Sequence, residues 1–163
     1  MHISVQAETF NLAQVFTISR GSRTQAQVLT VRITQNGVVG WGECVPYARY
    51  GETIETVTTQ IKSLGAIKRA DLKAALPAGA ARNAVDCALW DLEAKTTGVR
   101  VSDIIGLDPL RPEITAYTLS LDTPVSMEAQ SRLNSFRPLL KIKLGTPDAV
   151  SYTHLTLPTM RLV

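Results

Sequence analysis

The stretch LLKIKLG, residues 139–145, has the pattern of an apolar β-strand, yet it contains two lysines, Lys141 and Lys143. Because side chains along a strand alternate between its faces, both ammonium groups point to the same side. On the edge of a sheet, such a pair forms a solvated face that discourages unwanted strand pairing. Inside a cavity, like-charge repulsion and burial lower the pKa of each amine, and a lysine brought towards neutrality can serve as a general base near pH 7. The lysines have a chemical role only if this strand lines a site.

The residues before this stretch place it in a parallel sheet. Residues 114–121 (ITAYTLSL) have the pattern of a strand, and a helix then begins at Thr123 and Pro124 and runs to about Asn134. Strand, helix and strand in this order form a βαβ unit, which requires parallel pairing of the two strands. Parallel strands are usually covered on both faces, so two lysines in the second strand are unusual.

The N-terminal part has the pattern of an antiparallel meander. Residues 3–9 alternate between apolar and polar side chains, as in a half-buried strand. Two further runs, VLTVRIT and VVGWGEC, flank Asn36 and Gly37, a pair typical of the type I′ turn that joins two hairpin strands. The polar residues 19–25 predict an irregular loop between the first two strands.

Helices are predicted after the meander. Thr53 can cap a helix over residues 54–64, which has apolar side chains on one face. Residues 80–96 predict a second helix that is Ala-rich and apolar almost all round, so it should be buried, and Gly98 follows its end. The segment VSDIIGL predicts a short helix capped by Ser102.

Composition and charge exclude several classes of protein. The 163 residues carry 17 basic and 14 acidic side chains, and the basic ones are scattered rather than gathered into a nucleic-acid or polybasic membrane surface. The start of the chain has no apolar signal segment, and no apolar run is long enough to span a bilayer. Cys44 and Cys87 lack a metal-ligand spacing, so free thiols in a reducing compartment are preferred over a disulfide. We therefore expect a cytoplasmic protein that binds neither nucleic acid nor membranes.

Five stretches in a fixed order carry a resemblance to a known family. They are ISRGSRTQAQV, GWGECVPYARYGET, LPAGAARNAVDCALWDL, AYTLS and KIKLG, and together they cover residues 1 to about 147. With this order and spacing, the chain resembles the enolase superfamily, muconate-lactonizing-enzyme subgroup, and within it the L-Ala-D/L-Glu (dipeptide) epimerases. Any one stretch alone would be a weak signal, but the set is specific.

The resemblance implies a fold of two parts. Residues 1–110 would form an α+β capping domain, an antiparallel meander with helices, and residues 111–150 would begin a truncated (β/α) barrel with its first βαβ unit. In barrels of this kind the active site lies at the C-terminal ends of the strands. Asp86 and Asp91, which recur in the family, are interpreted as structural hydrogen-bonding groups.

The resemblance also implies roles for five residues. Lys143 would abstract or return the α-proton on one face of the substrate, and Lys141 would tune its electrostatics. Arg23 would grip a carboxylate of the dipeptide, while Thr118 and Tyr50 would contact the substrate. From the residues alone, the alternatives are a solvated loop arginine, a threonine that fills a strand position and a tyrosine that packs its loop onto the cap.

The implied reaction is Mg²⁺-assisted epimerisation of a small dipeptide through an enolate, in cytoplasmic murein peptide metabolism. A Lys base working beside Mg²⁺ is the known arrangement of enolase-type sites, and it is carried over here with the resemblance. The family's metal carboxylates come from later barrel strands, so no metal ligand is assigned in this chain. A homo-oligomer is possible for the whole protein. The alternatives are an N-acylamino acid racemase, a muconate cycloisomerase, an o-succinylbenzoate synthase or a non-catalytic truncated product.

The last stretch, residues 151–163 (SYTHLTLPTMRLV), departs from the family pattern. It has no acidic residue, no helical periodicity and a proline at position 158. It also resembles a peptide that recurs where sequencing-adapter DNA has been read as coding. We therefore expect this tail to be non-native and the gene to continue, so that the chain alone is an inactive fragment.

Overall fold

The computed structural model describes residues 1–145, and these form two compact units. The first unit contains Met1–Phe10 and Gln27–Leu110, and the second contains Asn11–Ala26 together with the residues from Arg111 onward. The predicted non-native tail lies outside the described residues.

A three-stranded sheet begins the chain, in the order β1-β2-β3. The strands are β1 (His2–Ile18), β2 (Gly21–Gln35) and β3 (Val38–Cys44), with β2 and β3 antiparallel. Asn36 and Gly37 both have positive φ, 50° and 80°, as the type I′ turn requires. The meander and its second turn are therefore confirmed.

The irregular loop expected over residues 19–25 is wrong. Only two residues separate β1 from β2, so the first hairpin continues almost to its tip. Hydrogen bonds between opposite side chains run along it: Thr17 Oγ1 with Ser22 Oγ at 2.9 Å, and Gln25 Nε2 donating to Asn11 Oδ1 at 2.9 Å. Here polar side chains pair across the two strands. Such strands lack the alternation of apolar and polar residues from which a strand is predicted, so the sequence did not indicate them.

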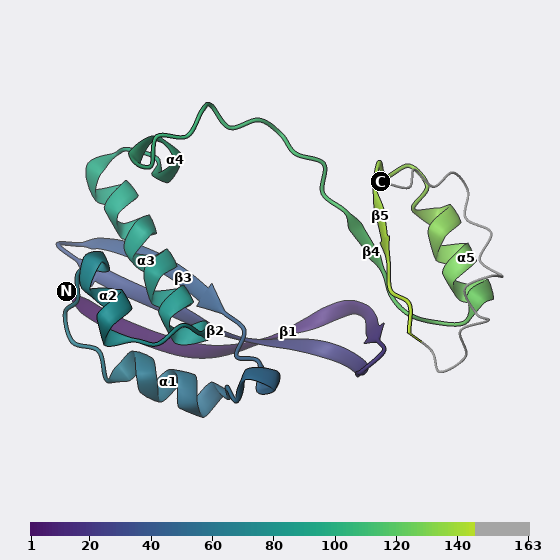
Figure 1. Ribbon diagram of the computed structural model, residues 1–163, viewed down its shortest axis with the longest axis horizontal. Coiled ribbons are helices and arrows are strands. Elements are labelled where there is room, and N and C mark those ends of the chain that lie inside the picture. Colours follow the sequence, from purple (N-terminus) through teal and green to yellow (C-terminus); the bar gives the residue numbers. More distant parts are fainter. Residues whose placement is uncertain (146–163) are drawn as a thin grey trace. The chain divides into compact units, whose positions relative to one another are not determined.

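Helices complete the first unit, and Figure 1 shows the longest of them, α3, lying along the sheet. They are the 3-10 turn η1 (Ala48–Tyr50), α1 (Ile54–Lys62), α2 (Arg69–Ala75), α3 (Ala80–Thr97) and α4 (Val101–Ile104). The sequence did not predict α2, because a helix of seven residues shows little periodicity. No helix in the described part is long and apolar enough to cross a membrane.

Of the helix caps predicted for the first unit, one is confirmed and one is wrong. Thr53 caps α1 as expected, and its hydroxyl accepts a hydrogen bond from the Thr56 amide. Ser102 does not cap α4, because Arg100 is the extended residue before the helix and Ser102 lies inside it. The Arg100 guanidinium pairs with the Asp103 carboxylate at 3.0 Å, which favours a start at this earlier position.

Close contact between α3 and β3 builds the core of the first unit. Gly40 and Gly42 face the helix, and a side chain at either position would overlap the backbone carbonyl of Ala88 or Ala84, respectively. The alanine-rich helix therefore lies directly on the strand, as the apolar pattern predicts. The largest fully buried side chains around this contact are Leu29, Val31, Ile33, Val57, Ile61, Leu72 and Val85.

The second unit contains the predicted βαβ arrangement. Strand β4 (Tyr117–Leu119), helix α5 (Pro124–Leu133) and strand β5 (Leu140–Ile142) follow one another, and β4 pairs with β5 in parallel. Thr123 caps α5, and its hydroxyl accepts from the Ser126 amide at 3.3 Å, with proline as the first helical residue. The α+β class, with a small parallel sheet after the meander, is confirmed.

Candidate functional site

The lysine pair lies at the end of β5. Thr118 pairs with Lys141 in the parallel register, so their side chains leave the sheet on the same face, and Lys143 follows two residues later. The Lys143 amide donates to the Leu119 carbonyl at 3.2 Å, which extends the pairing beyond the strand. The register thus brings Thr118, Lys141 and Lys143 together at one end of the sheet.

The pKa of Lys143 lies below the ordinary lysine value. The main cause is repulsion from the Lys141 ammonium, followed by desolvation, a side-chain hydrogen bond with Lys141 and repulsion from Arg20. A lowered pKa raises the neutral fraction of the amine at a given pH, and a neutral amine is the form that accepts a proton. The electrostatics of the pair therefore favour the neutral form of the Lys143 amine.

The tip of the first hairpin lies against the ends of β4 and β5. The Thr17 amide donates to Ser120 Oγ at 2.6 Å, and the Leu121 amide donates to the Thr17 carbonyl at 3.0 Å. At the end of β5, Gly145 is so close to Ser19 that a side chain on the glycine would collide with it. Segments about 100 residues apart in sequence thus meet inside the second unit.

Arg20, rather than Arg23, is the arginine that the hairpin tip brings to the lysines. Arg20 lies in the two-residue turn between β1 and β2, and its charge contributes to the lowered pKa of Lys143. Arg23 lies on β2 with an exposed side chain, and it is not among the charges that lower the pKa of Lys143. Sequence reasoning missed Arg20, although the R-G-S-R signal contains both arginines.

Tyr50 belongs to the first unit, so the structure does not join it to the lysine group. It ends the turn η1, its side chain is 76% exposed, and its ring centroid lies 5.7 Å from that of Tyr47. A loop that presents an exposed aromatic ring is suited to contact a ligand.

A metal ion has no ready ligand set in the described part. Within residues 1–145, no group of three or more His, Cys, Asp or Glu side chains is placed to hold one. The side chains of residues 1–145 therefore do not form a Mg²⁺ site among themselves.

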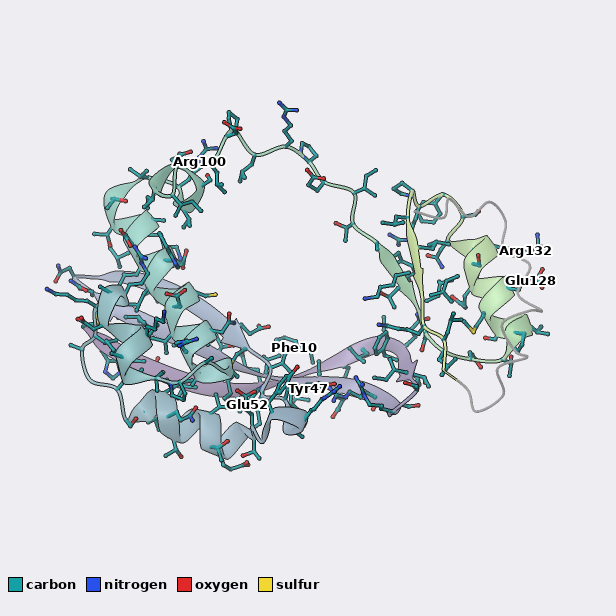
Figure 2. The ribbon with its side chains drawn as sticks, in the orientation of Figure 1. Phe10, Tyr47, Glu52, Arg100, Glu128 and Arg132 are labelled. Atoms are coloured by element: carbon teal, nitrogen blue, oxygen red, sulfur yellow. The ribbon has the colours of Figure 1, made fainter. Side chains whose placement is uncertain are left out.

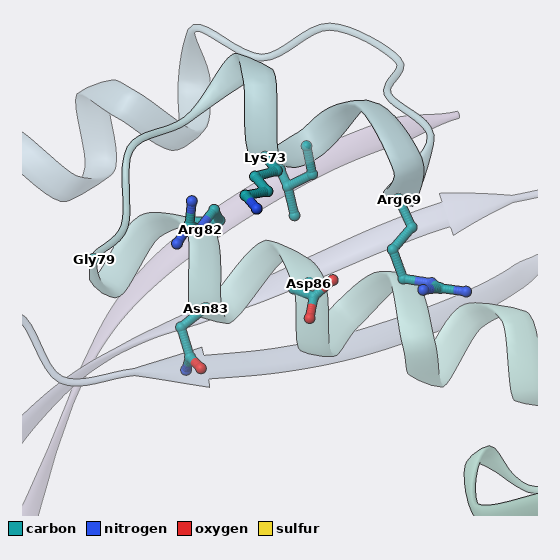
Figure 3. A pocket seen from close by; sticks show the side chains of 7 residues that line it. Arg69, Lys73, Gly79, Arg82, Asn83 and Asp86 are labelled. Atoms are coloured by element: carbon teal, nitrogen blue, oxygen red, sulfur yellow. The ribbon is translucent and has the colours of Figure 1, made fainter. Parts of the chain in front are cut away.

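A hollow of about 460 Å³ lies between α2 and α3 in the first unit (Figure 3). Arg69, Lys73 and Arg82 surround it together with Asn83 and Asp86. Arg69 already pairs with Glu93 at 3.1 Å. The hollow contains none of the predicted site residues.

The structural roles expected for two aspartates differ in outcome. Asp91 accepts hydrogen bonds from the Trp41 amide at 2.8 Å and from Lys95 Nζ at 2.6 Å, so it joins α3 to β3 as expected. The expectation is wrong for Asp86, whose carboxylate makes no hydrogen bond among the described residues. Asp86 is half-buried beside the hollow, and among residues 1–145 no backbone donor bonds to it.

Comparison with known proteins places the chain in a family. Residues 1–106 match the N-terminal domain of the mandelate racemase / muconate lactonizing enzyme family. The chain belongs to this family. Among curated relatives of this chain, L-Ala-D/L-Glu epimerase of Escherichia coli is 42% identical over 149 residues, 87% of this chain and 46% of that protein. N-acetyl-D-glutamate racemase of Pseudoalteromonas is 44% identical over 132 residues, 76% of this chain and 41% of that protein.

Solved structures of similar proteins agree with the fold. One is an enolase family member from Agrobacterium tumefaciens that is described as homologous to dipeptide epimerases and is bound to sodium and L-Ala-L-Glu. It is 47% identical to this chain, with a TM-score of 0.88, and the match covers 94% of this chain and 49% of that one. A dipeptide epimerase from Enterococcus faecalis, bound to Mg and L-Leu-L-Tyr, is 26% identical with a TM-score of 0.80 over 94% of this chain and 47% of its own. This chain spans about half the length of the curated relatives it matches.

Proposed function

We propose that this chain, in a protein of its relatives' full length, contributes to epimerisation at the α-carbon of the C-terminal residue in L-Ala-D/L-Glu dipeptides. The observation that carries the proposal is the lysine pair at the end of β5, with its lowered Lys143 pKa, in a chain 42% identical to an L-Ala-D/L-Glu epimerase. Residues 1–110 would form the capping domain, and residues 111–150 would begin the barrel.

Removal of the α-proton is the difficult step in this reaction. The proton lies beside a carboxylate, so its loss places a second negative charge on the same group. Neutral Lys143 Nζ takes the proton from one face of the α-carbon and holds it as an ammonium. Inversion needs a proton delivered to the opposite face, and we place that donor outside residues 1–145. The nearby charges of Lys141 and Arg20 stabilise the enolate more than the substrate, which lowers the activation free energy of proton removal.

Substrate recognition is assigned to Arg23, Thr118 and Tyr50. Arg23 grips a carboxylate of the dipeptide, because a guanidinium offers bidentate hydrogen bonds to such a group. Arg20 is a second candidate for this contact, since it lies nearer to Lys143. Thr118 contributes a hydroxyl from the lysine face of the sheet, and Tyr50 an aromatic wall.

Mg²⁺ is the proposed cofactor, supported by the Enterococcus faecalis structure, and it would add positive charge to stabilise the enolate. We place its ligands outside residues 1–145. The proposed compartment is the cytoplasm, supported by the free thiols of Cys44 and Cys87. A homo-oligomer is proposed for the whole protein.

The 44% identity to N-acetyl-D-glutamate racemase supports a second candidate, racemisation of N-acylated glutamate. An L-Ala-Glu dipeptide is itself an N-acylated glutamate, so both substrates have their α-proton between an amide nitrogen and a carboxylate. The same lysine pair can serve either reaction. The two differ in the free ammonium group, which only the dipeptide carries.

The test uses a version of the chain extended to the length of its relatives. Exchange of the α-proton in D₂O is followed by NMR for L-Ala-D-Glu, L-Ala-L-Glu and N-acetyl-D-glutamate. Lys143→Ala should abolish epimerisation of all three substrates and α-proton exchange of the epimer whose proton faces Lys143, while Lys62→Ala, an exposed lysine on α1, should leave both unchanged. Unchanged exchange in the Lys143 variant would overturn the assignment, and faster turnover of N-acetyl-D-glutamate than of the dipeptides would favour the second candidate.

A further inference from the structure

The Glu52 carboxylate joins two backbone amides that are far apart in the sequence. Its Oε1 accepts a hydrogen bond from the Ala80 amide at 2.6 Å, and its Oε2 accepts one from the Tyr47 amide at 3.1 Å. Tyr47 and Glu52 lie side by side in Figure 2, both in the first unit. A single half-buried side chain therefore connects the loop after β3 with the first residue of α3.

On the helix side, Glu52 supplies a cap that α3 does not provide for itself. The N-cap residue is Gly79, which has no side chain to accept from the first helical amides. A carboxylate is favoured at this end by the helix dipole, and its hydrogen bonds are charge-assisted. Gly79 also leaves room for it, because a Cβ there would lie 2.7 Å from Glu52 Oε1.

On the loop side, Glu52 closes the turn that carries two tyrosines. The Tyr47 carbonyl accepts from the Tyr50 amide at 2.8 Å and from the Glu52 amide at 3.4 Å. The rings of Tyr47 and Tyr50 pack with centroids 5.7 Å apart, and Tyr50 remains 76% exposed. The position of the exposed Tyr50 ring therefore depends on Tyr47, whose amide Glu52 holds.

We propose that Glu52 is a positioning residue that sets substrate affinity by holding the Tyr47–Tyr50 turn against the start of α3. The inference rests on the proposed function, in which Tyr50 contacts an N-acylated amino acid. A glutamine cannot replace the carboxylate, because its amide has one acceptor oxygen and would turn an NH₂ group towards the second backbone N–H.

Amide hydrogen exchange of the 163-residue chain tests the connection itself. Glu52→Gln should accelerate exchange of the Tyr47 and Ala80 amides about tenfold or more, the loss expected when a hydrogen bond to a charged group is broken. The matched control is Glu55→Gln, which removes the same charge from an exposed position on α1 and should leave both amides unchanged. Unchanged protection in the Glu52 variant would overturn the proposal.

A second variant separates the connection from the stability of α3. Ala80→Pro removes the helix-side donor and puts the proline Cδ where the amide hydrogen met Glu52 Oε1, so the carboxylate must move away. Proline itself is well tolerated as the first residue of a helix. It should accelerate exchange of the Tyr47 amide while the later amides of α3 stay protected. Full protection of Tyr47 in this variant would show that the loop does not depend on the helix.

Kinetics of the extended protein test the consequence for substrate. Glu52→Gln should raise KM for L-Ala-L-Glu by about 2- to 12-fold, the cost of ordering one side chain on binding, with a smaller change in kcat. An unchanged KM beside accelerated exchange would overturn the positioning role. If the unaltered extended protein does not epimerise the dipeptide, the proposed function is overturned, and with it the effect of Glu52 on substrate affinity. Hydrogen exchange still decides whether Glu52 holds the turn.

Discussion

Replacing Gly42 with alanine should destabilise the first unit, because the structure leaves no space for a methyl group there. A Cβ at this position would overlap the Ala84 carbonyl and crowd the Ala88 amide. Both are backbone groups of α3, so no change of rotamer can relieve the overlap, and the helix must move away from the sheet.

Two effects of opposite sign decide the magnitude. Alanine in a strand is favoured over glycine by about 0.5–1 kcal/mol, because it loses less backbone entropy on folding. Overpacking of a close-packed core costs about 1–3 kcal/mol, and more where backbone must shift. Because the overlap is with backbone, we take the upper end of that cost, which leaves a net loss of about 2–2.5 kcal/mol in the free energy of unfolding. This corresponds to a decrease of about 1 M in the urea midpoint.

Urea unfolding followed by tryptophan fluorescence reports on the first unit alone, because Trp41 and Trp90 both lie in it. Gly65→Ala is the matched control. That glycine does not have positive φ, and a Cβ there would meet nothing within 4 Å. The control should change stability by less than about 1 kcal/mol, in the stabilising direction. Equal urea midpoints for Gly42→Ala and the unaltered chain would refute the argument from close contact.

Two further predictions concern titration. Lys141→Met should raise the pKa of Lys143 towards the ordinary lysine value, because it removes the strongest repulsion on that amine. A ¹³C NMR titration of the Lys143 side chain measures the change. An unchanged titration midpoint would contradict the electrostatic coupling of the two lysines. The Asp91 carboxyl has a pKa below its usual value, because the raising effect of desolvation is outweighed by hydrogen bonds from Lys95 and the Trp41 amide together with the Lys95 charge. A carboxylate with a lowered folded-state pKa stabilises the protein above its unfolded pKa, and this contribution is lost as the pH falls through the folded value. Asp91→Asn should therefore cost about 0.5–1 kcal/mol at pH 7 and progressively less as the pH falls below about 4 in urea titrations; a cost that does not vary with pH would show that charge is not involved.

Local signals in the sequence determined most of the secondary structure. Asn36 and Gly37 specify their turn because few residues adopt positive φ without strain. Thr53 and Thr123 start their helices because a hydroxyl one residue before the helix accepts from its free amides. The alternation around Lys141 likewise predicted a strand that follows a helix and pairs in parallel with its predecessor. The turn and the caps depend on residues within a few positions of one another, and the parallel pairing follows from the order strand, helix, strand.

Tertiary structure decided which distant groups meet. The R-G-S-R stretch does not show that Arg20 rather than Arg23 approaches Lys143, because that depends on how the hairpin tip meets the ends of β4 and β5. The connection from Glu52 to Ala80 spans 28 residues and has no sequence signal. The N-cap residue of α3 is a glycine, which has no side-chain acceptor, and nothing near it in the sequence indicates that Glu52 supplies one. Periodicity and capping are signals from residues that are close together in the sequence. A binding site is formed by residues that are far apart in the sequence, and those residues come into contact only when the chain has folded.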